Sequence, residues 1–200
     1  ITAMFTLATS AFAGGMVGVK YGTGDLDGTS KSYVAGGTTY AAQSGSKSND
    51  FAALFAEYNV MESPVSLGLE YVPFSADISL NGSMSGSSAR VKDYTTVYAL
   101  AMAELANIGI YAKLGYSMAD IGTVKPNDGQ TTINSNSNEL KGIMYGAGIQ
   151  SKELAMGIVA RAEYTFTEFD DISVTTTSNG SASVKKTASG ELETITFSIA

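Results

Sequence analysis

The stretch IGIYAKLGY, residues 108–116, decides how the rest of the chain is interpreted. Every second residue in it is apolar: Ile108, Ile110, Ala112, Leu114 and Tyr116. The positions between them include two glycines and a lysine. A period of two is that of a β-strand whose two faces meet different surroundings. The closing tyrosine has an apolar ring and a polar hydroxyl, which suits the boundary between lipid hydrocarbon and headgroups.

The same alternation recurs along the chain and predicts eight strands. They are expected near 15–22, 50–60, 65–73, 93–103, 108–116, 140–150, 155–166 and 191–200. Most are close to the ~9–11 residues of a tilted strand that spans a membrane. Residues 97–106, VYALAMAELA, have high helix propensity, but the alternation that begins at Tyr94 favours a strand there.

The connections between these segments alternate in length. Residues 61–64, 104–107 and 151–154 form short turns, whereas the long polar loops are expected at 23–49, 74–92, 117–139 and 167–190. Short turns on one side and long loops on the other are typical of bacterial outer-membrane barrels. We therefore predict one all-β domain: an eight-stranded, antiparallel, up-and-down transmembrane β-barrel.

The first thirteen residues, ITAMFTLATSAFA, are uncharged and end in Ala11-Phe12-Ala13. This ending fits the small-x-small cleavage site of a secretory signal. We expect residues 1–13 to be the remnant of a signal peptide and residues 14–200 to form the barrel domain.

Five tyrosines share one position in the pattern, at the end of an apolar face that joins a long loop. They are Tyr21, Tyr71, Tyr94, Tyr116 and Tyr164. Tyrosines at one level are expected to form an aromatic girdle that faces lipid.

The polar faces of the strands carry many glycines and a few charged side chains of both signs. The charged residues are Glu57, Glu70, Lys113, Arg161 and Glu163. On an inward face they would have to pair, because an unpaired buried charge is costly. The alternative is a soluble lipocalin-like barrel, whose charges face water and whose apolar residues point inward.

The composition argues against several classes of protein. The chain has neither cysteine nor histidine and a net charge of −7, which disfavours thiol or histidine catalysis and nucleic-acid binding. We expect no enzyme activity, no cofactor and no metal. Asp25, Asp27, Asp170 and Asp171 are interpreted as solvated turn residues in loops, with a Ca²⁺ site as the alternative.

The stretch GGMVGVKYGTGD at residues 14–25, the eight segments and the loop asymmetry together resemble the small OmpA-like outer-membrane barrels, a family that includes OmpX-like proteins. The resemblance implies a monomer in the outer membrane of a Gram-negative bacterium, in contact with lipid and lipopolysaccharide and inserted by the outer-membrane assembly machinery. Family members hold a cluster of arginine, lysine and glutamate inside the barrel, a role that would fall to the five charged residues above. Family members also usually end on an aromatic residue, whereas this chain ends Phe197-Ser198-Ile199-Ala200.

The expected function is structural or surface-interacting. The long loops would face outward and could contact an extracellular ligand, a phage or a surface partner. One alternative is a narrow porin-like channel for small solutes, although eight strands leave an interior that side chains fill. The other is a soluble periplasmic or secreted lipocalin-like binding protein.

Overall fold

The computed structural model of the chain describes residues 14–35, 37–60, 63–73, 75–80, 87–106, 108–121, 131–135, 139–178 and 184–200. The expected signal remnant, residues 1–13, lies outside this described part. No helix in the described ranges is both long enough and apolar enough to cross a lipid bilayer.

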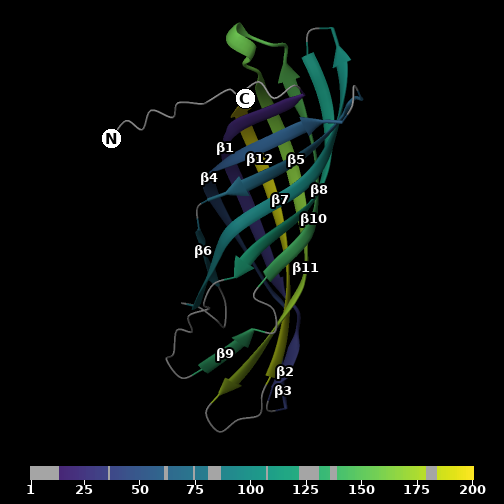
Figure 1. Ribbon diagram of the computed structural model, residues 1–200. Coiled ribbons are helices and arrows are strands. Elements are labelled where there is room, and N and C mark those ends of the chain that lie inside the picture. The colour runs from purple at the N-terminus through teal and green to yellow at the C-terminus, as the bar shows by residue number, and fades with distance from the viewer. Residues whose placement is uncertain are drawn as a thin grey trace, which may run out of the picture.

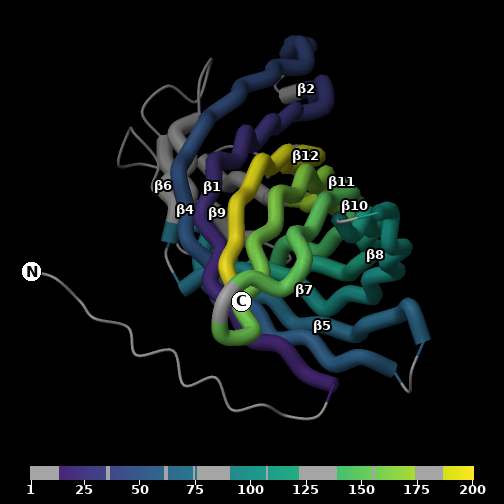
Figure 2. The backbone as a smooth tube through the Cα atoms, turned by 90° about the horizontal axis from the view of Figure 1, so that it is seen from above, coloured from purple at the N-terminus to yellow at the C-terminus, as the bar shows by residue number. Residues whose placement is uncertain are grey.

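Eight long strands in the described part close into a ring, as predicted. They are β1 (Gly15–Ser30), β4 (Gln43–Asn59), β5 (Val65–Val72), β7 (Ser87–Leu105), β8 (Ile108–Ile121), β10 (Glu139–Ser151), β11 (Ala160–Ser178) and β12 (Val184–Ile199). Each pairs antiparallel with its neighbours in the order β1–β4–β5–β7–β8–β10–β11–β12, and β12 returns to β1. Viewed from above, the chain follows this ring (Figure 2). The barrel is therefore up-and-down and closed.

Four short strands extend the ring at one end. β2 (Tyr33–Ala35) and β3 (Thr38–Tyr40) form a separate hairpin, β6 (Ala76–Leu80) pairs with β7, and β9 (Thr131–Ser135) pairs with β11. Figure 1 places β2, β3 and β9 at the end of the barrel opposite the C-terminus. The short turns and the extensions thus lie at opposite ends.

The strands reach far into the segments that the sequence predicted as loops. β1 and β4 remain paired from Gly15 opposite Tyr58 to Ser30 opposite Gln43, so most of residues 23–49 is β-sheet. β11 and β12 likewise pair out to Thr176 opposite Val184. A strand with water on both faces needs no alternation of apolar and polar residues, so its sequence carries no period to detect.

The aspartates expected in loops also belong to strands. Asp25 and Asp27 lie within β1, and Ser48 of β4 donates a hydrogen bond to Asp25. Asp170 and Asp171 lie in β11 where its register with β12 shifts, between Phe169 and Ile172. The interpretation of these residues as turn chemistry was wrong.

Two local predictions had different outcomes. Residues 97–105 are strand, as the alternation indicated and helix propensity did not. β11, however, begins at Ala160 rather than near 155, because Ala155–Gly157 form a 3₁₀ turn with positive φ at Met156 (64°) and Gly157 (80°).

The faces of the barrel are inverted relative to those of a soluble protein. In β12 the outward residue Phe197 is 64% exposed, while the inward residue Thr196 next to it is 1% exposed. In β8 the outward residues Ile110 and Leu114 are exposed, and Lys113 between them is buried. Large aliphatic side chains therefore cover the outside.

β7 has the opposite facing to the one predicted. Tyr98 and Leu100 are buried inside the barrel, and Val97 and Ala101 are exposed outside. Both faces of this strand are apolar, so the alternation could not identify the outer one. Tyr98 and Leu100 fill the interior, while the smaller Val97 and Ala101 lie outside.

Candidate functional site

The five charged residues predicted for the interior all lie there, together with a sixth. Glu57, Glu70, Lys113, Arg161 and Glu163 are each buried, and so is Lys20 of β1. They project from β4, β5, β8, β11 and β1, so the cluster spans the lumen from several sides. Three cations face three anions, and their formal charges cancel.

Two lysines and two glutamates form a square of ion pairs. Lys20 Nζ lies 2.6 Å from both Glu70 Oε2 and Glu163 Oε1. Lys113 Nζ contacts the same two oxygens, at 2.9 Å and 3.1 Å respectively. Each carboxylate is thus shared by two ammonium groups, and each ammonium group by two carboxylates. Such mutual neutralisation offsets the cost of removing four charges from water.

Arg161 and Glu57 form a second, bidentate pair. Arg161 Nη1 and Nη2 donate to Glu57 Oε1 and Oε2 over 2.7 Å and 2.8 Å. Arg161 Nε also donates to Gln150 Oε1 at 2.6 Å. The planar guanidinium matches the two oxygens of a carboxylate, which fixes both distance and direction.

Two tyrosines link the square to the bidentate pair. Tyr98 donates to Glu57 Oε1 at 2.7 Å, and its ring lies 3.8 Å beneath Lys113 Nζ. Tyr111 donates to Glu163 Oε2 at 3.1 Å, and its ring lies 5.3 Å from the Arg161 guanidinium. Each ring face adds a cation–π contact to its hydroxyl's hydrogen bond. All six charges therefore belong to one connected network.

Glycines on neighbouring strands make room for these two rings. A Cβ atom at Gly68 would lie 2.3 Å from Tyr98 Cζ, and one at Gly148 would lie 2.4 Å from Tyr111 Cζ. Either separation is far too short for two carbon atoms. The inward glycines noted in the sequence are thus required where an aromatic ring crosses the neighbouring strand.

The network crosses the lumen, and its charged groups are occupied with one another. The described residues contain no group of three Asp or Glu side chains that could hold a metal ion. Every charged group in the network already has an ionic partner within 3.1 Å. The arrangement can hold the strands together and obstruct the lumen.

Four of the five predicted girdle tyrosines point outward. Tyr21, Tyr116 and Tyr164 are exposed, and Tyr71 is half-buried with its hydroxyl 3.0 Å from Asp93 Oδ1. The structure differs from the expectation at Tyr94, which belongs to the inward face of β7. Its hydroxyl lies 3.0 Å from Ser117 Oγ and 3.3 Å from Thr167 Oγ1, and its ring meets Phe169 edge to face.

Lys20, Tyr98, Tyr111 and Gln150 also belong to the site, although they were not predicted for it. Lys20 and Tyr111 could have been found, because Lys20 lies between Val19 and Tyr21 and Tyr111 lies between Ile110 and Ala112, so the alternation turns both inward. Tyr98 could not, because it lies on the same face of its strand as Tyr94, which was expected to meet lipid.

Comparison with known proteins supports the fold. No protein-family model matches the chain, and no curated protein matches its sequence. Among solved structures, the outer membrane protein OprG from Pseudomonas aeruginosa superposes with a TM-score of 0.67 at 13% identity, covering 94% of this chain and 95% of that one. Neisserial surface protein A gives 0.46 at 12% identity, with 89% and 95% covered, and Ail of Yersinia pestis gives 0.37 at 15%, with 88% and 98% covered. The superposition on OprG shows that the chain has the barrel fold of a bacterial outer-membrane protein.

Proposed function

We propose that this protein is an integral outer-membrane β-barrel of a Gram-negative bacterium, with a structural or surface-interacting role. The observation that carries the proposal is the inversion of the two faces. Ile110, Leu114 and Phe197 are among many large apolar side chains exposed around the outside, while six charges lie inside. A soluble barrel with this exterior would aggregate, whereas a bilayer accommodates it.

The inverted faces argue against the lipocalin-like alternative. A soluble barrel places its apolar residues in the lumen and its charges in water. Here Arg161 and Glu57 are 4% and 3% exposed, which is the reverse arrangement. Charged residues inside and apolar residues outside are the arrangement of a barrel that is surrounded by lipid.

The filled lumen argues against the channel alternative. The two ion-pair groups and the rings of Tyr98 and Tyr111 cross the interior from different strands. An eight-stranded barrel is only just wide enough for its own side chains. The interior therefore serves as a plug that braces the wall.

The extended end of the sheet supports a role at the cell surface. The exposed apolar side chains form a band around the outside of the barrel, which ends at Tyr21 in β1 and at Leu54 in β4. Beyond this apolar band, β1 and β4 continue as polar, exposed strands, and the β2–β3 hairpin presents Val34 and Tyr40 to solvent. We assign this end to the outside of the cell, where it could meet lipopolysaccharide or an extracellular ligand, phage or surface partner. Because each of the eight strands has two neighbours in the ring, the proposed state is a monomer.

Cell fractionation tests the proposal. The protein should be found in the outer-membrane fraction, require detergent for extraction, and migrate faster on gels before boiling than after. N-terminal sequencing of that material should begin near Gly14, which tests the proposed signal remnant. Recovery of a monomer from the periplasm without detergent would refute the membrane assignment. Large, stable single-channel currents would refute the proposal that side chains obstruct the lumen.

A further inference from the structure

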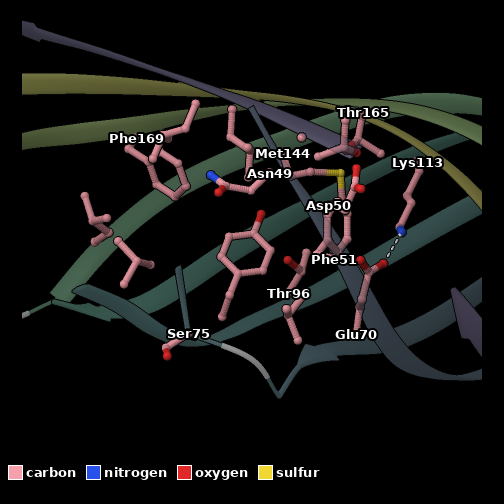
Figure 3. A pocket seen from close by; sticks show the side chains of 18 residues that line it. Asn49, Asp50, Phe51, Glu70, Ser75, Thr96, Lys113, Met144, Thr165 and Phe169 are labelled. Carbon is pink, nitrogen blue, oxygen red and sulfur yellow. Dashed lines mark hydrogen bonds and ion pairs between the residues drawn. The ribbon is translucent and has the colours of Figure 1, made fainter. Parts of the chain in front are cut away.

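A cavity lies in the barrel beside the charge network, on the side away from the bidentate pair. It has a volume of about 130 Å³, and its wall is formed largely by Val72, Tyr94, Leu140, Met144, Phe169 and Leu192. These side chains come from β5, β7, β10, β11 and β12. Figure 3 shows Phe169 at one side of the cavity and the Glu70–Lys113 ion pair at the other.

The volume of the cavity and the apolar residues of its wall suit one small aromatic ring. An apolar protein cavity of about 150 Å³ stays free of water and takes up benzene. The present cavity is nearly as large and has an aromatic ring and a thioether in its wall, both good surfaces for another ring.

One end of this cavity offers a charged acceptor. Both ammonium groups that neutralise Glu70 contact its Oε2 atom. Its side chain is 9% exposed and lines the cavity. The hydroxyls nearby are already engaged, with Thr96 bonded to Ser117 and Thr165 bonded to Thr194. Neither lysine donates to Glu70 Oε1, so this oxygen is the part of the carboxylate left for a further donor.

The cavity also has a side that solvent reaches. Asp50 and Ser75 are exposed and line it, as does the half-buried Asn49. These three residues are not part of the charge network, so the cavity reaches solvent on a side that the network does not occupy.

We propose that this cavity is a binding site for a single-ring compound that carries one hydroxyl or amine donor. The ring packs between Phe169 and Met144, and the donor reaches Glu70 Oε1. This site goes beyond the anchoring role, does not depend on it, and requires no passage of solute through the barrel.

The test uses phenol as the probe and fluorobenzene as its matched analogue without a donor. The protein, folded in detergent and labelled with ¹³C at the methionine methyls, is titrated with each compound. Met144 reports from inside the cavity, and Met156, which is 91% exposed on the 3₁₀ turn, reports nonspecific effects. Phenol should shift the Met144 methyl saturably and leave Met156 unchanged. Fluorobenzene should bind at least about tenfold more weakly, because it cannot donate to a charged acceptor.

Two substitutions in β5 test whether the shift of the Met144 methyl signal arises from binding in the cavity. Val72→Phe fills the cavity and should abolish the saturable shift. Leu69→Phe adds the same ring to the outward face of β5 and should preserve it. Heat-dependent gel mobility shows whether each variant folds, and Leu140→Phe replaces Val72→Phe if that one does not. The proposal is overturned by the absence of a saturable shift, by equal affinity for the two probes, or by binding that survives filling of the cavity.

Discussion

Removal of Arg161 should destabilise the barrel through its effect on Glu57. In Arg161→Ala, Glu57 loses two charge-assisted hydrogen bonds of 2.7 Å and 2.8 Å and, among the contacts of the described residues, keeps the hydrogen bond from the Tyr98 hydroxyl. At about 1.5–3 kcal/mol each, these bonds amount to about 3–6 kcal/mol. Breaking a buried ion pair from one side costs about 3–5 kcal/mol, which agrees with this range.

A double-mutant cycle separates the pair from its surroundings. Glu57→Ala should cost about as much as Arg161→Ala, and the double variant about as much as either, giving a coupling energy of about 3–5 kcal/mol. Arg161 makes no direct hydrogen bond to Glu163 among the described contacts, so the cycle with Glu163→Ala should give a clearly smaller coupling.

Reversible urea unfolding in phospholipid vesicles provides the measurement. The chain has no tryptophan, so circular dichroism and gel mobility would follow unfolding. Lys31→Ala removes an exposed ion pair with Asp171 and serves as the control, with little expected change. Additive effects of Arg161→Ala and Glu57→Ala would refute the reasoning, and so would stronger coupling of Arg161 to Glu163.

Three further changes test other parts of the structure by the same unfolding measurement. Leu69→Arg puts a charge on the outward face and should cost about 2–4 kcal/mol near the bilayer midplane; a neutral result would contradict the membrane assignment. Gly68→Ala forces a methyl group into the Tyr98 ring and should cost about 1–3 kcal/mol, whereas Gly28→Ala, whose nearest atom is 4.0 Å away, should be tolerated. Tyr98→Phe removes the hydroxyl from Glu57 but keeps the ring, so it should cost about 1.5–3 kcal/mol, and no change would mean that the hydroxyl is dispensable.

The sequence predicts the barrel well because the membrane-spanning part of most strands has apolar residues on one face and polar or small residues on the other. In residues 108–116 the aliphatic side chains lie on one face and Lys113 and two glycines on the other. The structure confirms this division, with the aliphatic face outside and Lys113 inside. The same signal fails in β7, where Val97 and Ala101 outside are as apolar as Leu100 inside. It also fails beyond the apolar band, because the polar ends of β1 and β4 have water on both faces.

The charged residues could be found, but their partners could not. Alternation turns Glu57 and Arg161 inward, yet 104 residues separate them, and nothing local indicates that they meet. Which carboxylate pairs with which cation depends on strand stagger and on the rings of Tyr98 and Tyr111. These features emerge only when the ring of strands is complete.

The ion-pair square has a consequence for the order of assembly. Lys20 lies on the first strand and its partner Glu163 on the last but one, 143 residues later in the chain. Until β12 joins β1, Lys20 cannot be held in place between Glu70 and Glu163. Closure of the ring therefore brings the last charges together when β12 forms its hydrogen bonds with β1. An incomplete barrel would carry an electrostatic penalty that the finished one lacks, which makes the final step cooperative.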